Sequence, residues 1–144
     1  MYLSYEHIAG RFLESPDLSP TRAANIRGRL LPAAWALQRR LMERGLVFEI
    51  NPKTGTIISG TQYGGFRPQD CPEGAPHSNH KEGLAVDVFD PGHRIDGALL
   101  ASPTLLDECG VWIEHPDVTI VDAGAGWSHW QCVPPRSGRR MFYP

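Results

Sequence analysis

The residues best suited to metal chemistry lie in the run from Ser78 to Asp87, SNHKEGLAVD. Its second half predicts a strand over Gly83 to Phe89, and side chains alternate between the two faces of a strand. Asp87 then shares a face with Ala85, while the opposite face carries three apolar residues that suit a core: Leu84, Val86 and Val88. A buried carboxylate is costly without a partner, so Asp87 needs either a metal ion or an arginine beside it.

A second candidate run, WSHWQ, extends from Trp127 to Gln131 and is also strand-like, with His129 on the same face as the two end residues. A histidine between tryptophans is more often packed in a core than bound to a metal. Two histidines and one carboxylate, however, are a common ligand set for catalytic zinc, with the fourth position left to water. The nitrogen and oxygen donors therefore favour a catalytic metal site over a structural one.

Cysteine content and charge argue against other classes. Three cysteines, Cys71, Cys109 and Cys132, are far apart and form no CxxC pair, so neither a cysteine zinc site nor a disulfide framework is predicted. A net charge of -2 gives no electrostatic case for nucleic-acid binding. No apolar run approaches the roughly 18 residues that span a bilayer. We therefore expect no nucleic-acid partner and no membrane insertion.

The ligands must be positioned by elements that begin with a long helix. Ser19 and Pro20 are a typical helix start. Apolar residues then recur at helical spacing on one face: Ile26, Leu30, Ala34, Leu37 and Leu41. Pro32 should kink or divide this helix, and Gly45 should end it. We expect a helical cap over about residues 1–45, within a single domain of residues 1–144.

The remainder, about residues 46–144, is predicted to be the metal-binding core. A hairpin is expected from residues 47–50 and 56–59, followed by a long loop over residues 60–79. A short helix over residues 102–110 and strands over residues 111–114 and 127–133 complete the elements. The predicted fold class is α+β, with helices packed on a small antiparallel sheet that carries all three ligands.

The spacing of these motifs resembles a known family. The pattern S-x-H-x-x-G-x-A-x-D at 78–87, followed about forty residues later by W-x-H at 127–129, is similar to the zinc D-alanyl-D-alanine carboxypeptidases and their phage endolysin relatives. Upstream, residues 58–60 and 66–68 resemble the family's SGxRxP element with a longer insertion, and the ending at 142–144 is similar to short phage peptidases. The resemblance covers about residue 20 to the C-terminus and implies the hedgehog-type fold.

This resemblance assigns roles to individual residues. It implies that His80, Asp87 and His129 bind Zn²⁺, and that Arg67 holds the substrate's carbonyl or carboxylate. In the family the general base is an acidic residue that precedes the last histidine, so Glu114, on a predicted strand, is the expected base and Asp122 is its rival. Substrate contacts are expected from Ser78 and Trp127, although Ser78 could instead only cap a turn.

The implied activity is zinc-dependent hydrolysis of peptidoglycan stem peptides. A carboxypeptidase and an endolysin-type endopeptidase both remain possible, and the alternative is a catalytically silent zinc-binding module of a phage or prophage. The N-terminal run MYLSYEHIAGRF carries His7 and Arg11 where a signal peptide has its apolar core. We therefore expect synthesis in the cytoplasm and action at the cell wall, through phage-type release or virion delivery.

Overall fold

A divided helix spans the N-terminal part of the chain. The computed structural model describes residues 1–119 and 126–144. After α1 (Tyr5–Ala9) and the 3₁₀ turn η1 (Gly10–Phe12), α2 (Pro20–Asn25) continues through the π-helical turn η2 (Ile26–Leu30) into α3 (Leu31–Glu43). The Ser19 side chain accepts a hydrogen bond from the Arg22 amide and caps α2. Pro32 cannot donate to the α-helical ladder, and the neighbouring Leu31 amide donates to the Ile26 carbonyl five residues back. The predicted division at Pro32 is therefore confirmed.

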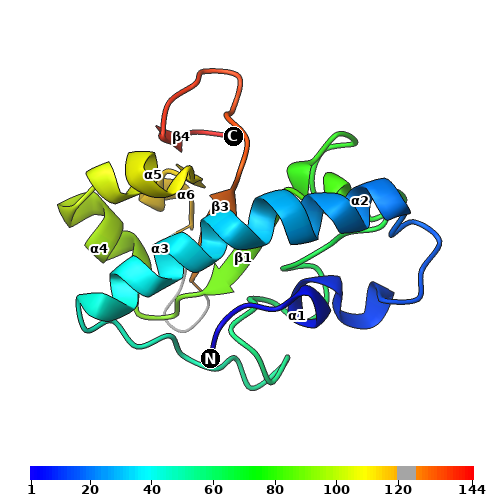
Figure 1. The fold of residues 1–144 in the computed structure, drawn as a ribbon, viewed down its shortest axis with the longest axis horizontal. Coiled ribbons are helices and arrows are strands. Elements are labelled where there is room, and N and C mark those ends of the chain that lie inside the picture. The colour runs from blue at the N-terminus through cyan, green and yellow to red at the C-terminus, as the bar shows by residue number, and fades with distance from the viewer. Residues whose placement is uncertain (120–125) are drawn as a thin grey trace.

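The apolar stripe of this helix is buried, as its spacing predicts. Its five members are at most 2% exposed: Ile26, Leu30, Ala34, Leu37 and Leu41. They belong to the same hydrophobic cluster as three residues of the sheet, Val86, Val88 and Trp130. In Figure 1 the rod formed by α2 and α3 crosses in front of the sheet strands. The helix thus covers the core face of the sheet and leaves the other face to the site.

The sheet has four strands in the order β1-β3-β2-β4. These are β1 (Ala85–Phe89), β2 (Trp112–Glu114), β3 (Trp127–Gln131) and β4 (Met141–Phe142). The pairs β1–β3 and β2–β3 are antiparallel, but β4 pairs with β2 in parallel. The α+β class is confirmed, whereas the prediction of a purely antiparallel sheet is wrong. The cause is β4, a two-residue strand too short to give a periodic signal.

The predicted hairpin of residues 47–50 and 56–59 does not form a ladder. Only single bridges join Asn51 to Thr56 and Ile58 to Val88. The buried Asn51 side chain instead donates to the carbonyls of Ile58 and Gly60, at 2.9 and 2.8 Å. Backbone groups that a hairpin would pair are thus satisfied by one amide side chain. The predicted loop over residues 60–79 is confirmed as far as residue 78. The 3₁₀ turn η3 (Asn79–Glu82) begins at the next residue.

Short helices connect the strands. Helix α4 (Arg94–Ala101) follows β1, α5 (Thr104–Cys109) precedes β2, and α6 (Pro116–Thr119) follows it. The Asp90 carboxylate accepts hydrogen bonds from the amides of Ile95 and Asp96 and so caps α4, an element that the sequence did not predict. Of the helices described, none has the length and apolar character needed to cross a bilayer.

Candidate metal centre

The three predicted ligands meet at one point, from two kinds of element. Asp87 on β1 lies directly opposite His129 on β3, which confirms that they occupy adjacent strands and one face. His80 comes from η3, so the prediction that the sheet carries all three ligands is wrong. The Ser78 side chain caps η3 by accepting from the His80 amide at 3.3 Å. Gly83 ends the turn with a φ of 73°, which favours glycine, and the turn directs His80 over β1.

The donor atoms have the spacing of a ligand set. One ligand atom from each of the three residues lies within 4.8 Å of the other two. Asp87 Oδ1 is 2.9 Å from His129 Nδ1 and 3.3 Å from His80 Nε2. Ligands about 2.0–2.1 Å from a tetrahedral zinc ion lie roughly 3.3 Å apart. These residues could therefore hold a metal ion with little movement.

The outer nitrogen of each histidine has an acceptor of its own. His80 Nδ1 lies 2.9 Å from the Gly65 carbonyl oxygen, and His129 Nε2 lies 2.9 Å from Gln131 Oε1. The Gln131 amide is oriented because its nitrogen donates to the Val133 carbonyl at 2.8 Å. Hydrogen bonds of this kind fix the tautomer of metal-binding histidines. With the ring proton on the outer nitrogen, each neutral histidine would direct a lone pair at Asp87.

Asp87 is held in its charged form. Burial by itself would raise the pKa of Asp87, but the charges and hydrogen bonds of His80 and His129 hold it well below its usual range. Burial would likewise lower the pKa of His129, yet the hydrogen bond and charge of Asp87 raise it. If both histidines are instead neutral, the carboxylate faces two lone pairs and a cation is needed between them. The positive charge beside Asp87 can therefore be a proton on His129 or a metal ion.

Arg67 supplies the alternative partner that the sequence allowed for Asp87. Arg67 Nη2 lies 3.3 Å from Asp87 Oδ2, and Arg67 Nε donates to the Tyr63 carbonyl at 2.7 Å. The two histidines contact the other carboxylate oxygen, Oδ1. The arginine and a metal ion are therefore compatible partners, one on each oxygen.

Glu114 lies beside the ligands on β2. The register pairs Trp112 with Gln131 and Ile113 with Trp130, and one further step brings Glu114 level with His129. Glu114 Oε1 is 3.9 Å from His129 Nδ1, the nitrogen that faces Asp87. The expected strand position of Glu114 is confirmed. Its rival Asp122 lies outside the described residues.

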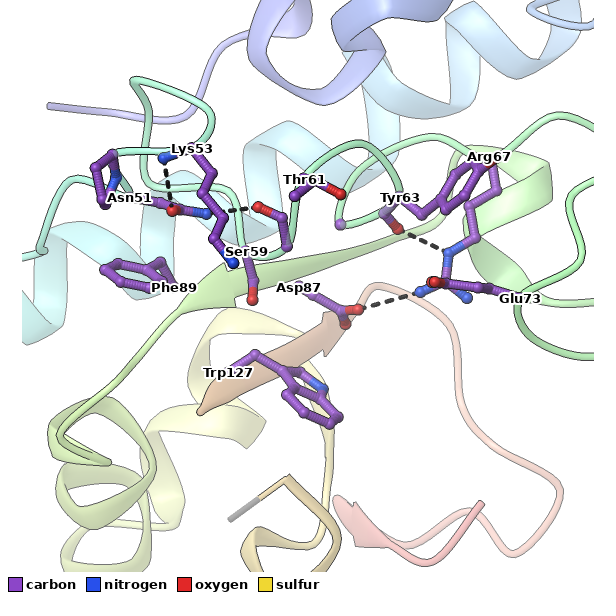
Figure 2. A pocket seen from close by; sticks show the side chains of 13 residues that line it. Asn51, Lys53, Ser59, Thr61, Tyr63, Arg67, Glu73, Asp87, Phe89 and Trp127 are labelled. Atoms are coloured by element: carbon purple, nitrogen blue, oxygen red, sulfur yellow. Dashed lines mark hydrogen bonds and ion pairs between the residues drawn. The ribbon is translucent and has the colours of Figure 1, made fainter. Parts of the chain in front are cut away.

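An open cleft of about 520 Å³ leads to Asp87. Figure 2 shows the side chains that line it, with Asp87 near the centre and Trp127 below. Arg67 and Trp127 both line this cleft, as expected of substrate contacts. Ser78 is not among the lining residues, and its hydroxyl caps η3 instead.

Several contributing residues were not assigned a role from the sequence. Gln131 shares a face with His129 by strand alternation, so an acceptor for the outer histidine nitrogen could have been inferred from that pattern. Gly65, whose carbonyl faces His80, and Lys53, which lines the cleft, lie in irregular segments. Such segments have no periodicity that indicates which groups face the site.

Comparisons with family models, with curated proteins and with solved structures found no match to this chain. The resemblance drawn from the motifs at residues 78–87 and 127–129 therefore stays a prediction. Function has to be argued from the site itself.

Proposed function

We propose that this chain is a zinc-dependent peptidase that hydrolyses peptidoglycan stem peptides. The observation that carries the proposal is the convergence of His80, Asp87 and His129, with Glu114 near His129 and with Asp87 lining an open cleft. Nitrogen and oxygen donors of this kind suit a catalytic zinc site. The choice of peptidoglycan as substrate rests on the motif resemblance alone.

The chemistry divides between the metal and the chain. Bound zinc would supply a water of lowered pKa and would polarise the scissile carbonyl. Glu114 is the proposed base, which accepts a proton from the attacking water and passes it to the leaving amine. Its position 3.9 Å from His129 Nδ1 supports this role, since the base must lie next to the ligands.

Arg67 has two proposed tasks. Its ion pair with Asp87 balances the carboxylate charge and orients the ligand oxygen. A guanidinium has five N–H donors in a fixed plane, so further donors remain for a substrate carbonyl in the cleft. Positioning the substrate in this way would complement the proton transfer by Glu114.

Metal content and thermal stability test the site. Purified protein should bind one equivalent of zinc, and zinc at about 1,000 times its Kd should raise Tm by roughly 10 °C, because a ligand of the native state adds stability by mass action. His80→Ala should lose both effects. His77→Ala removes an exposed histidine three residues away and should retain them. Equal Tm with and without zinc in the unmodified protein would exclude the site.

Hydrolysis of purified peptidoglycan tests the activity. The zinc-loaded protein should release peptide fragments, and chelation should stop the release. The terminal residue released or the internal bond cut then distinguishes a carboxypeptidase from an endopeptidase. Zinc binding without any hydrolysis would instead support the silent module of a phage or prophage.

A further inference from the structure

Two basic side chains line the cleft, and they differ in what surrounds them. Figure 2 shows Lys53 and Arg67 on either side of Asp87. Arg67 is bonded to Asp87 and to the Tyr63 carbonyl. Glu73 lines the same cleft, from a segment whose Gly74 lies against the Arg67 guanidinium. The positive charge of Arg67 is therefore already balanced within the protein.

The positive charge of Lys53 is not balanced by an acidic partner among the described residues. Its side chain extends into the cleft towards Ser59 (Figure 2). No ion pair involves Lys53 in the part of the chain that the structure describes. The acidic residues that line the cleft are Asp87 and Glu73. Asp87 is paired with Arg67, and Figure 2 shows Glu73 on the Arg67 side of the cleft. The Lys53 side of the cleft thus presents a positive charge to a ligand.

The turn that carries Lys53 is held firmly. Asn51 is only 2% exposed, and its Oδ1 accepts from the Lys53 amide at 3.0 Å. The same side chain donates to the carbonyls of Ile58 and Gly60. The Asn51 backbone amide also donates to the Thr56 carbonyl at 2.8 Å. A buried, fully engaged amide therefore fixes where this irregular segment places its lysine, which lowers the ordering cost of binding at that point.

We propose that Lys53 determines specificity by binding a carboxylate of the peptide substrate, on the side of the cleft away from Arg67. The inference rests on the proposed peptidase function and adds a requirement for an anionic group. The lysine ammonium is a point charge on a flexible side chain. It can bind a carboxylate through a charge-assisted hydrogen bond. The carboxylate can be a free C-terminus or an acidic side chain.

Four short peptides separate these two sources. They are acetyl-D-alanyl-D-alanine as free acid and as C-terminal amide, and acetyl-D-glutamyl-D-alanine amide with its glutamine counterpart. Their Kd values are measured by calorimetry on the zinc-loaded Glu114→Gln protein, in which hydrolysis should be negligible. The same titrations are run after adding Lys53→Gln, Lys53→Arg or Arg39→Gln. Arg39 is an exposed cation on α3 outside the cleft, so it controls for total charge.

Lys53→Gln should weaken binding of one anionic peptide about tenfold, within the range for a partly exposed charged hydrogen bond. Its uncharged counterpart should bind as before, Lys53→Arg should restore most of the affinity, and Arg39→Gln should change little. If only the free acid loses affinity, Lys53 binds the C-terminal carboxylate. If only the glutamyl peptide loses affinity, Lys53 binds the side-chain carboxylate.

Equal affinities with and without the Lys53 substitution would overturn the inference, as would an equal loss for charged and neutral peptides. If peptidoglycan is hydrolysed by the unsubstituted protein while Lys53→Gln changes no Kd, only the role of Lys53 fails. If none of the four peptides binds the zinc-loaded protein, the proposed role of Lys53 fails too, and continued hydrolysis of peptidoglycan would show that the peptidase function stands without it.

Discussion

Two buried carboxylates lie near strand β3, Asp87 of β1 on one face of the sheet and Asp96 of α4 on the other. On the cleft face, Asp87 contacts His129 at 2.9 Å. On the opposite face, Asp96 lies near Ser128 and accepts a hydrogen bond from the Thr119 hydroxyl at 2.7 Å. The exposed fractions of Asp87 and Asp96 are only 9% and 1%, so the two carboxylates differ chiefly in their partners.

The partners shift the pKa values of the two carboxylates in opposite directions. Two histidines outweigh burial at Asp87 and hold its pKa low. At Asp96, burial raises the pKa, and the hydroxyls of Ser128 and Thr119 only partly oppose it. Two cationic neighbours can outweigh the cost of burying a charged carboxylate, whereas two hydroxyl neighbours do not. The surroundings of Asp87 therefore suit a bound cation, whereas those of Asp96 do not.

The largest expected effect is on metal binding. Asp87→Asn removes the one anionic ligand and should weaken zinc binding by more than about 100-fold, beyond the usual cost of losing an outer hydrogen bond. Asp96→Asn makes the same chemical change on the opposite face and should leave zinc affinity within about twofold. Competition with a zinc chelator measures both. Equal zinc affinity in the two variants would remove the distinction between the faces.

The next effect is on catalysis. Glu114→Gln should keep zinc binding and lose about 10²–10⁴-fold in rate, because general acid–base catalysis contributes about that much. Asp122→Asn should keep most of the activity. Rates of peptidoglycan hydrolysis by the zinc-loaded variants decide between them. The reverse pattern would assign the base to Asp122, and full activity in both would mean that neither residue is the base.

A smaller effect should follow from the hydrogen bond behind His129. Gln131→Leu removes the acceptor for His129 Nε2 and should weaken zinc binding by about 10–100-fold, the usual cost of such a loss. The same chelator competition measures it. An unchanged affinity would mean that the His129 tautomer is fixed by some other contact.

Zinc affinity should also depend on pH. The raised pKa of His129 means that a proton competes with zinc for Nδ1, so affinity should fall as pH drops through that value. In zinc-free protein the sign reverses: protonated His129 contributes stability that is complete below its unfolded pKa of about 6.5 and lost as pH rises through the folded value. The zinc-induced rise in Tm should therefore grow between pH 5 and pH 8. A constant rise would contradict this linkage.

The smallest effect concerns stability on the opposite face. Because the pKa of Asp96 is raised, its contribution is complete below the unfolded pKa of about 3.9 and is lost as pH rises through the folded value. Asp96→Asn should remove that loss, so the free energy of unfolding of the variant should rise relative to that of the unsubstituted protein between pH 5 and pH 8. Urea unfolding of the zinc-loaded proteins at the two pH values measures the change. An unchanged pH dependence would show that Asp96 is charged in the folded protein.

Regular elements were the predictable part of the molecule. Alternation predicted the face of each strand that carries Asp87 or His129, and helical spacing predicted the buried stripe of α2 and α3. The placement of His80 on a capped 3₁₀ turn could not be predicted, because a turn has no period. The hydrogen bonds of Asn51 could not be predicted either, because they depend on a single side chain. The parallel pairing of β4 could not be predicted because that strand has only two residues.

The most direct test is a crystal structure of the zinc-loaded protein with anomalous diffraction measured at the zinc edge. One peak should lie between His80 Nε2, Asp87 Oδ1 and His129 Nδ1, at about 2.0–2.2 Å from each. Glu114 should be the carboxylate nearest the open side of that peak. A structure with no peak there, in which Asp87 pairs only with Arg67 and a protonated His129, would contradict the proposed metal centre.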